Sequence, residues 1–227
     1  MTTKNYKIQY SFIFPTDEVL KYEIHLDENF NYILPENAPK SDWTKLEFHQ
    51  CSNCPLNKDK HPHCPVAINL NKIVEETKDK ISHERAKVEV IARERHYMKE
   101  TDTQSGLISL FGLIMSTSAC PHLSWFKPLA RFHLPFATVD ETMFRILSVA
   151  LIREYFNEGD NLVEGIQDIY SNIEKVNLGI IDRIRSHAKG DADANAIAAL
   201  DLFGKLFEFE LNSQFSTIRK YFKIDDH

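Results

Sequence analysis

The chain has 227 residues, a hydrophobic content of 43%, and only 7 glycines and 9 prolines. This length can bury a substantial core, and this composition is typical of an ordered globular protein rather than a disordered chain. The net charge is -6 and the lysines and arginines are scattered, so the sequence argues against a surface for phosphate backbones. We expect no nucleic-acid partner.

The beginning of the chain and its most apolar segment argue against export and membrane insertion. The first residues, MTTKNYKIQYSFIFPTDEV, lack the uninterrupted apolar stretch and the cleavage site of a signal peptide. GLISLFGLIMSTSA, residues 106–119, would form a helix of only about 20 Å, shorter than a bilayer core of about 30 Å. We therefore expect no membrane contact and a cytoplasmic location, where cysteines stay reduced or bind metals.

The chain begins with two segments rich in β-branched and aromatic residues, YKIQYSFIF at 6–14 and VLKYEIHLD at 19–27. The intervening PTDE is typical of a turn, so the two segments predict a β-hairpin. Residues 86–98, AKVEVIARERHYM, could continue a helix that begins at Pro65, but valines alternate with charges there. We favour a third strand paired with the hairpin, because an isolated hairpin is only marginally stable.

From residue 105 onward the sequence predicts helices. The first is the buried apolar segment, which Pro121 would end, and TVDE at 138–141 fits a capping box that begins the next. Apolar residues spaced alternately four and three apart predict a long helix from Leu162, with Gly190 as its C-cap. A last helix follows the acidic DAD at 191–193.

These elements predict an α+β fold: a small N-terminal antiparallel sheet with a Cys-rich connection, packed on a C-terminal helical bundle. The boundary is expected near residue 100, giving lobes at 1–100 and 101–227 that could form one integrated domain. The last helix carries phenylalanines on more than one face, so it must be buried on several sides. We therefore expect a homo-oligomer or a protein partner, unless this helix is the centre of the bundle.

The segment CSNCPLNKDKHPHCPVAINL, residues 51–70, contains three of the four cysteines of the chain. Cys51 and Cys54 have the Cys-x-x-Cys spacing, and Cys64 follows ten residues later. Zinc requires four ligands in a tetrahedron, and Cys120 is the leading fourth because Cys54, Cys64 and Cys120 are each followed by proline. The alternative fourth ligands are His49, His61, His63 and His122.

Four protein ligands leave no open position for water, so such a zinc site would be structural. An iron–sulfur cluster remains an alternative, since Cys-Pro steps also occur beside clusters. A redox dithiol and structurally inert thiols remain open as well. The resulting expectation is a metal-stabilised cytoplasmic binding or scaffold protein.

A second unusual stretch is ACPHLSWFKPLARFHLPFATVDE, residues 119–141. Aromatic and basic residues concentrate there, just after two carboxylates, and such a combination could form a pocket for a small anion. The predicted ligand-binding residues are Glu100, Asp102, Lys127, Arg131 and His133, which would suit an enzyme or a small-anion sensor. The alternative is structural: Arg131 pairs with a carboxylate, and His133 forms a hydrogen bond at a helix junction.

Two signatures, CxxCPL…CPVA and SxCPH…ARFHLPFA, together resemble a family of uncharacterised bacterial proteins of similar length, a domain of unknown function. The resemblance covers most of the chain and implies no activity. It implies that the four cysteines act as one set. The chain contains no GxGxxG, GxxxxGK[ST] or GxSxG motif, so the sequence identifies no catalytic residues.

Overall fold

The computed structural model describes residues 6–157, 162–213 and 215–222. Its sheet contains β1 (Tyr6–Ile13), β2 (Val19–Leu26), β3 (Arg85–Ile91) and β4 (His96–Asp102), in the order β2-β1-β3-β4. All neighbouring strands are antiparallel. The predicted hairpin and the predicted third strand are both present, and the fold is α+β.

The sequence predicts one strand over residues 86–98, whereas the structure has two strands, β3 and β4, in this part of the chain. The chain turns at residues 92–95, where the amide of Ala92 donates a hydrogen bond to the carbonyl oxygen of Arg95 (2.9 Å), and it returns as β4. β4 is an edge strand with the sequence HYMKETD, and most of its side chains are exposed. Because only one of its seven residues is buried, β4 lacks the alternation by which a half-buried strand is recognised.

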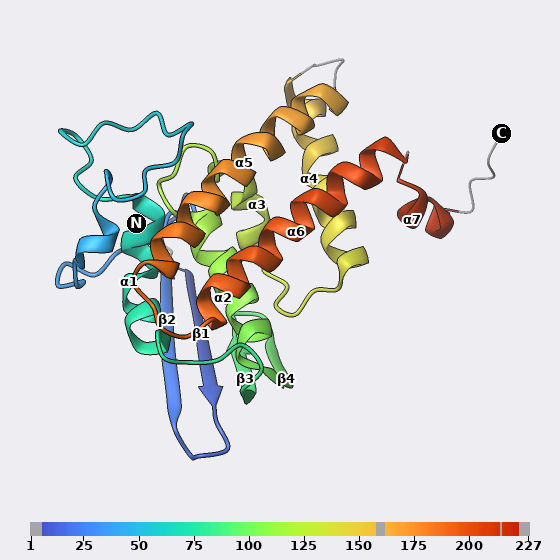
Figure 1. Ribbon diagram of the computed structural model, residues 1–227. Coiled ribbons are helices and arrows are strands. Elements are labelled where there is room, and N and C mark those ends of the chain that lie inside the picture. Colours follow the sequence, from blue (N-terminus) through green and yellow to red (C-terminus); the bar gives the residue numbers. More distant parts are fainter. Residues whose placement is uncertain (1–5, 158–161, 214, 223–227) are drawn as a thin grey trace.

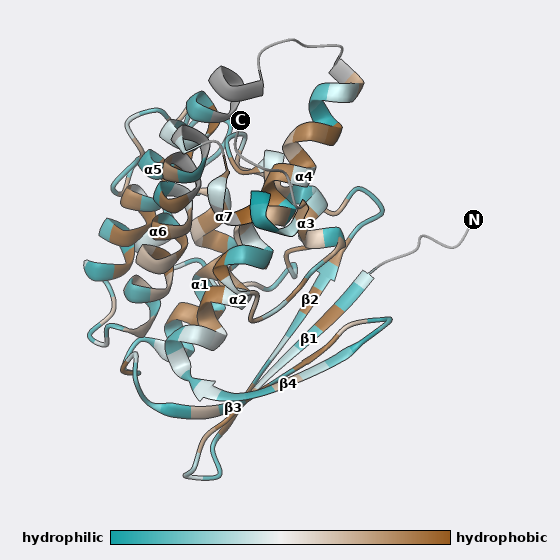
Figure 2. Ribbon diagram, turned by 90° about the vertical axis from the view of Figure 1, so that its right-hand side faces the viewer, coloured by the Kyte–Doolittle hydropathy of each residue, from teal (hydrophilic) through white to brown (hydrophobic). Residues whose placement is uncertain are grey.

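Seven α-helices complete the described fold: α1 (Pro65–Thr77), α2 (Thr103–Thr117), α3 (Lys127–Arg131), α4 (Val139–Asn157), α5 (Leu162–Arg185), α6 (Ala192–Asn212) and α7 (Ser216–Arg219). Single 3-10 turns lie at Asp42–Thr44, Ser124–Phe126 and Lys220–Phe222. α1 and α2 cover one face of the sheet, and α5 and α6 pack on the far side of these two helices (Figures 1 and 2). Within the described residues, no helix combines the length and apolar character needed to cross a membrane.

α2 connects the sheet layer to the helical layer. Gly106 lies so close to the sheet that an added Cβ would overlap the Phe12 ring and the Val88 side chain. The larger apolar core therefore continues from the sheet through α1 and α2 to the buried face of α5 and α6, where it includes Ile180 and Ile197. Sheet and helices share this core.

Three helix ends can be compared with the sequence. The capping box is confirmed, since the Thr138 amide donates to Glu141 Oε2 (2.8 Å) and the Glu141 amide donates to Thr138 Oγ1 (3.2 Å). α2 ends at Thr117, before Pro121, because Ser118 is already extended.

The prediction that Gly190 caps α5 was wrong. The Gly190 amide donates to the carbonyl oxygen of Lys78 (2.6 Å), and an added Cβ would overlap the carbonyl of Lys80, so this glycine permits close approach to the turn after α1.

Candidate metal centre

The cysteine loop, residues 51–64, is held between α5 and the segment that follows α2. The side-chain amide of Asn53 donates to the carbonyl oxygen and Oδ1 of Asn172 on α5 (3.0 and 2.9 Å). The carbonyl oxygen of Asn53 lies 2.9 Å from Nε2 of His122, which is two residues after Cys120 in sequence. The loop therefore brings distant parts of the chain to one place.

The four cysteines lie close together, and all are free thiols. In every pairing of Cys51, Cys54, Cys64 and Cys120, the charge on one sulfur raises the pKa of another, so the four thiols share one region of the fold. Cys64 and Cys120 are buried, and Cys51 and Cys54 are half-buried. The structure thus brings together the four cysteines predicted to form one set.

Backbone amides surround two of these sulfurs. The amides of Val66 and Ala67, in the first turn of α1, donate hydrogen bonds to the Cys64 sulfur. His122 and Leu123 donate to the Cys120 sulfur in the same way. Each sulfur therefore accepts hydrogen bonds from the backbone amides of the second and third residues after its cysteine. The first residue after each cysteine is a proline. Such donors favour a thiolate over a thiol.

Burial opposes ionisation of the thiols. It raises the pKa of Cys51 to about 12 and that of Cys120 to about 11, and it also raises the pKa of Cys64. A reactive or redox-active cysteine needs a lowered pKa, because the thiolate is the nucleophile. These three thiols are therefore unsuited to nucleophilic chemistry, whereas a bound metal ion would deprotonate them.

A buried arginine lies beside the sulfurs. Arg183 on α5 is only 1% exposed, and its guanidinium donates to the carbonyl oxygens of Trp43 (2.9 Å), Lys45 (2.7 Å) and Leu46 (2.7 Å). It forms no ion pair with a carboxylate in the part of the chain that the structure describes. Its positive charge lowers the pKa of both Cys51 and Cys64. A buried cation without an anion is costly, so this site favours negative charge on the sulfurs.

The sulfurs are neighbours but not a formed coordination shell. Among the described residues, no group of three or more Cys, His, Asp or Glu side chains is arranged to hold a metal ion. The Cys51 thiol instead points at the carbonyl oxygen of Val176, with 3.9 Å between sulfur and oxygen. The donor set has the type and neighbourhood that zinc prefers, and the sulfurs would have to turn toward a common centre to bind it.

Each of the alternative histidine ligands is either exposed or engaged with another group. His61 is exposed, and the other three lie within hydrogen-bonding distance of other groups: His49 of Ser186 (3.1 Å), His63 of Thr44 (2.8 Å) and His122 of the Asn53 carbonyl (2.9 Å). Burial, together with the charges of Lys40 and Lys45, lowers the pKa of His63. Cys120 is therefore better placed than these histidines to complete the set.

A family model described as a domain of unknown function (DUF6901) matches residues 8–223. The chain belongs to this family. The match confirms the resemblance to an uncharacterised domain family that the sequence suggested. No curated protein and no solved structure matches the chain.

The predicted ligand-binding residues of this DUF6901 domain are dispersed. Glu100 is exposed on β4, and Asp102 caps α2 by accepting a hydrogen bond from the Ser105 amide (2.7 Å). Lys127 donates to Asn31 Oδ1 (2.5 Å). Arg131 lies over the rings of Tyr6, Phe30 and Phe132, at 5.1 to 5.8 Å from their centroids. Only His133 of these five lines the large cavity of the helical layer.

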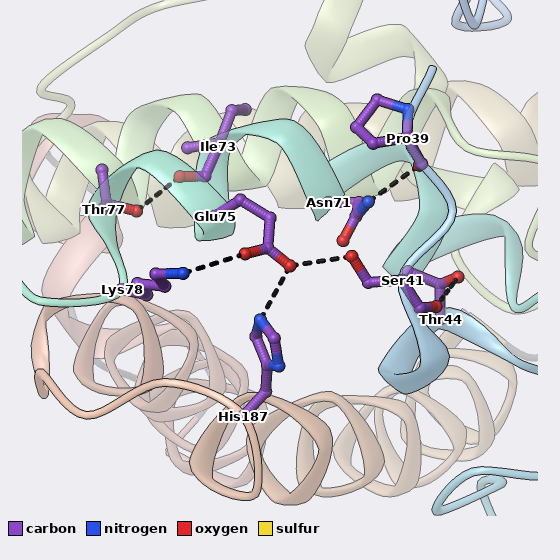
Figure 3. A network of polar contacts seen from close by, with 9 residues as sticks. All are labelled: Pro39, Ser41, Thr44, Asn71, Ile73, Glu75, Thr77, Lys78 and His187. Carbon is purple, nitrogen blue, oxygen red and sulfur yellow. Dashed lines mark hydrogen bonds and ion pairs between the residues drawn. The ribbon is translucent and has the colours of Figure 1, made fainter. Parts of the chain in front are cut away.

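A separate polar network joins α1 to the segment after α5 (Figure 3). Glu75 Oε1 accepts from Ser41 Oγ and contacts His187 Nε2, both at 2.8 Å, and Glu75 Oε2 lies 3.3 Å from Lys78 Nζ. Although partial burial opposes it, these contacts lower the pKa of Glu75. Ser41 and His187 both contact Glu75 rather than each other in Figure 3, so this is not a nucleophile–base pair.

Proposed function

We propose that Cys51, Cys54, Cys64 and Cys120 bind one metal ion, zinc, as a closed structural centre in a cytoplasmic binding or scaffold protein. The observation that carries this proposal is the convergence of four free thiols beside Arg183, a buried cation without a carboxylate partner among the described residues. Free thiols are also typical of a reducing compartment.

The charges of this group are complementary. Zn²⁺ with four thiolates has a net charge of about -2 by formal counting of the ligand set. Arg183 would offset part of this charge, and the amides that face Cys64 and Cys120 would stabilise the sulfurs further. A neutral four-thiol cluster would leave the buried guanidinium uncompensated, which makes inert thiols the weaker explanation.

The centre would connect segments that are distant in sequence. It would fix the loop at 51–54 to the start of α1 at Cys64 and to Cys120 after α2, against α5. Structural zinc can contribute apparent binding free energies on the order of 10 kcal/mol. The proposed role of this zinc is to stabilise the fold, because four cysteine ligands leave no coordination position for a substrate.

Metal analysis of the purified protein tests the proposal. We expect one zinc per chain in the wild type, and Cys54→Ser should lower both metal content and thermal stability. Ser52→Ala is a matched control, because Ser52 lies in the same turn and is exposed. A stable wild-type protein without metal would contradict the proposal. Bound iron together with visible absorption would instead identify the centre as an iron–sulfur cluster, since zinc is colourless.

The exposed face of α4 supports the binding or scaffold part of the proposal. Phe144, Leu151, Ile152, Tyr155 and Phe156 are 48 to 81% exposed along this helix. α4 lies at the edge of the helical layer, and Figure 2 shows hydrophobic residues along it. Exposed apolar patches of this kind commonly mark interaction sites. We propose a second copy of the chain as the partner, because two copies of one apolar face can cover each other about a twofold axis and form a closed dimer.

A further inference from the structure

A cavity of about 350 Å³ lies between α2, the segment after α3, and helices α4, α5 and α6. Apolar side chains form most of its wall, among them Ile108, Leu113, Ile146 and Phe203. None of the four cysteines lines it, so it is separate from the proposed metal centre. Its size falls within the range of small-molecule sites.

Two basic residues lie in this apolar wall, Lys99 from β4 and Arg145 from α4. Arg145 is half-buried, and its Nη2 donates to the carbonyl oxygens of Leu129 (3.0 Å) and Phe132 (2.8 Å). Neither basic residue forms an ion pair with a carboxylate within the described ranges. Glu141 is the carboxylate whose charge reaches Arg145, but it is engaged in the capping box with Thr138.

The other polar groups of the wall provide no anion. His133 is joined to the hydroxyl of Tyr10 (2.5 Å), and burial together with the charge of Arg145 lowers its pKa to about 3. The amide of Asn177 donates to Asp201 (3.2 Å), and the hydroxyl of Ser116 donates to backbone carbonyls of α2. The cavity thus presents a large apolar surface and a guanidinium that has no counter-ion among the residues the structure describes.

We propose that this cavity binds a small amphipathic carboxylate, whose apolar body lies along α2 and whose head group pairs with Arg145. Arginine binds carboxylates through two parallel hydrogen bonds, and Nη1 and Nε are not used by the contacts to Leu129 and Phe132. A cavity of about 150 Å³ holds one benzene ring, so this cavity suits an apolar body of roughly ten carbon atoms. Lys99, which is exposed on β4, would add positive charge at the entrance.

Calorimetric titration of the purified protein with octanoate and with 1-octanol tests the proposal. The two probes share their chain length and differ in charge. We expect octanoate to bind roughly 10-fold more tightly or better, as a charge-assisted hydrogen bond would provide. Arg145→Gln should remove this preference and leave 1-octanol binding unchanged. Equal binding of the two probes to the wild type, or no binding of octanoate, would overturn the proposal.

A second variant tests the place of binding without touching the charge. Gly112 lines the cavity, and an added Cβ there would meet only Leu200 Cδ2, at an ordinary 3.5 Å. The Cβ is thus accommodated, and the rest of the leucine side chain in Gly112→Leu would occupy part of the cavity, so we expect octanoate binding to weaken roughly 10-fold or more. Unchanged binding by folded Gly112→Leu would place the ligand elsewhere and refute the proposal. This variant and the wild-type comparison decide the question even if Arg145→Gln does not fold.

Discussion

Gly179 on α5 lies directly against Cys51, so that an added Cβ at 179 would come within 2.7 Å of the Cys51 sulfur. A glycine in the interior of a helix costs about 1 kcal/mol relative to alanine. Its presence here permits the cysteine loop to pack against α5. The contact therefore links the loop that carries three cysteines to the helix that carries Arg183.

Gly179→Ala should displace the Cys51 side chain. Overpacking of this kind costs about 1 to 3 kcal/mol, and it would exceed the gain in helix propensity. We expect a lower free energy of unfolding and weaker zinc retention in a competition with a chelator. Gly112→Ala is the matched control, since its Cβ would have ordinary contacts in α2, and it should be neutral or slightly stabilising. Equal behaviour of the two variants would separate Gly179 from the metal centre.

Arg183→Met should destabilise the protein by about 3 kcal/mol or more, because three buried carbonyl acceptors lose their donor. If the guanidinium also offsets the charge of a zinc–thiolate centre, the loss should be larger for the zinc-loaded protein than for the metal-free protein. Urea denaturation with and without zinc measures both values. Arg185→Met, on the exposed side of the same helix, is the control. An identical loss of unfolding free energy in the zinc-loaded and metal-free proteins would show that Arg183 stabilises the fold only through its hydrogen bonds to the backbone.

His133 predicts a specific dependence of stability on pH. Its pKa in the folded protein is about 3, whereas a histidine in the unfolded chain titrates near 6.5. Between these values the unfolded state binds a proton that the folded state excludes. The contribution of neutral His133 to the free energy of unfolding is therefore complete above about pH 6.5 and is lost as the pH falls toward 3. From about pH 7 to pH 5, the free energy of unfolding should fall by about 2 kcal/mol more in the wild type than in His133→Gln.

Urea denaturation of both proteins at each pH measures this difference. The comparison between variant and wild type is needed because Asp193 acts in the opposite direction. Burial raises the pKa of Asp193 to about 7. Its contribution to the free energy of unfolding is therefore complete below the pKa of an aspartate in the unfolded chain, and it is lost as the pH rises through 7. Asp193 is present in both proteins, and its effect cancels in the difference. Parallel stability curves would show that His133 is readily protonated in the fold.

The exposed face of α4 predicts assembly. Tyr155 and Phe156 are 81 and 75% exposed, and replacing both with glutamate should prevent burial of this face. Light scattering of the wild type should give about twice the chain mass of 26.3 kDa, and the double variant should give the chain mass. Leu202→Glu, which changes an exposed leucine of α6, is the control. A wild-type protein with the mass of one chain at micromolar concentration would reject the dimer.

Features that depend on neighbours in sequence were predictable. The hairpin at Tyr6–Leu26 and the box of Thr138 and Glu141 follow from local turn and capping chemistry. The shared Cys-Pro steps predict that Cys120 acts with the loop at 51–64, more than fifty residues away, and in the fold the charges of Cys54 and Cys64 raise the pKa of Cys120.

Features that depend on tertiary packing were not predictable. Arg183 lies in the sequence IIDRIR, among apolar positions of α5. Its place among these apolar residues was the only sign in the sequence that it is buried. Its relation to the sulfurs arises because α5 crosses the cysteine loop. Arg145 was missed for a similar reason, since its charge is notable only beside a cavity formed by several helices. Arg131, the arginine chosen from the sequence, stacks on aromatic rings instead.

The central claim, that the four cysteines hold one zinc ion, is tested most directly by titrating the native protein with a mercurial thiol reagent while a colorimetric chelator reports released zinc. Because Cys51, Cys54, Cys64 and Cys120 are the only cysteines of the chain, thiol modification and zinc release can be compared without ambiguity. We expect one zinc ion per chain to be released as the four thiols react, and the thermal stability of the protein to fall in parallel. Reaction of all four thiols without zinc release and without loss of stability would contradict it.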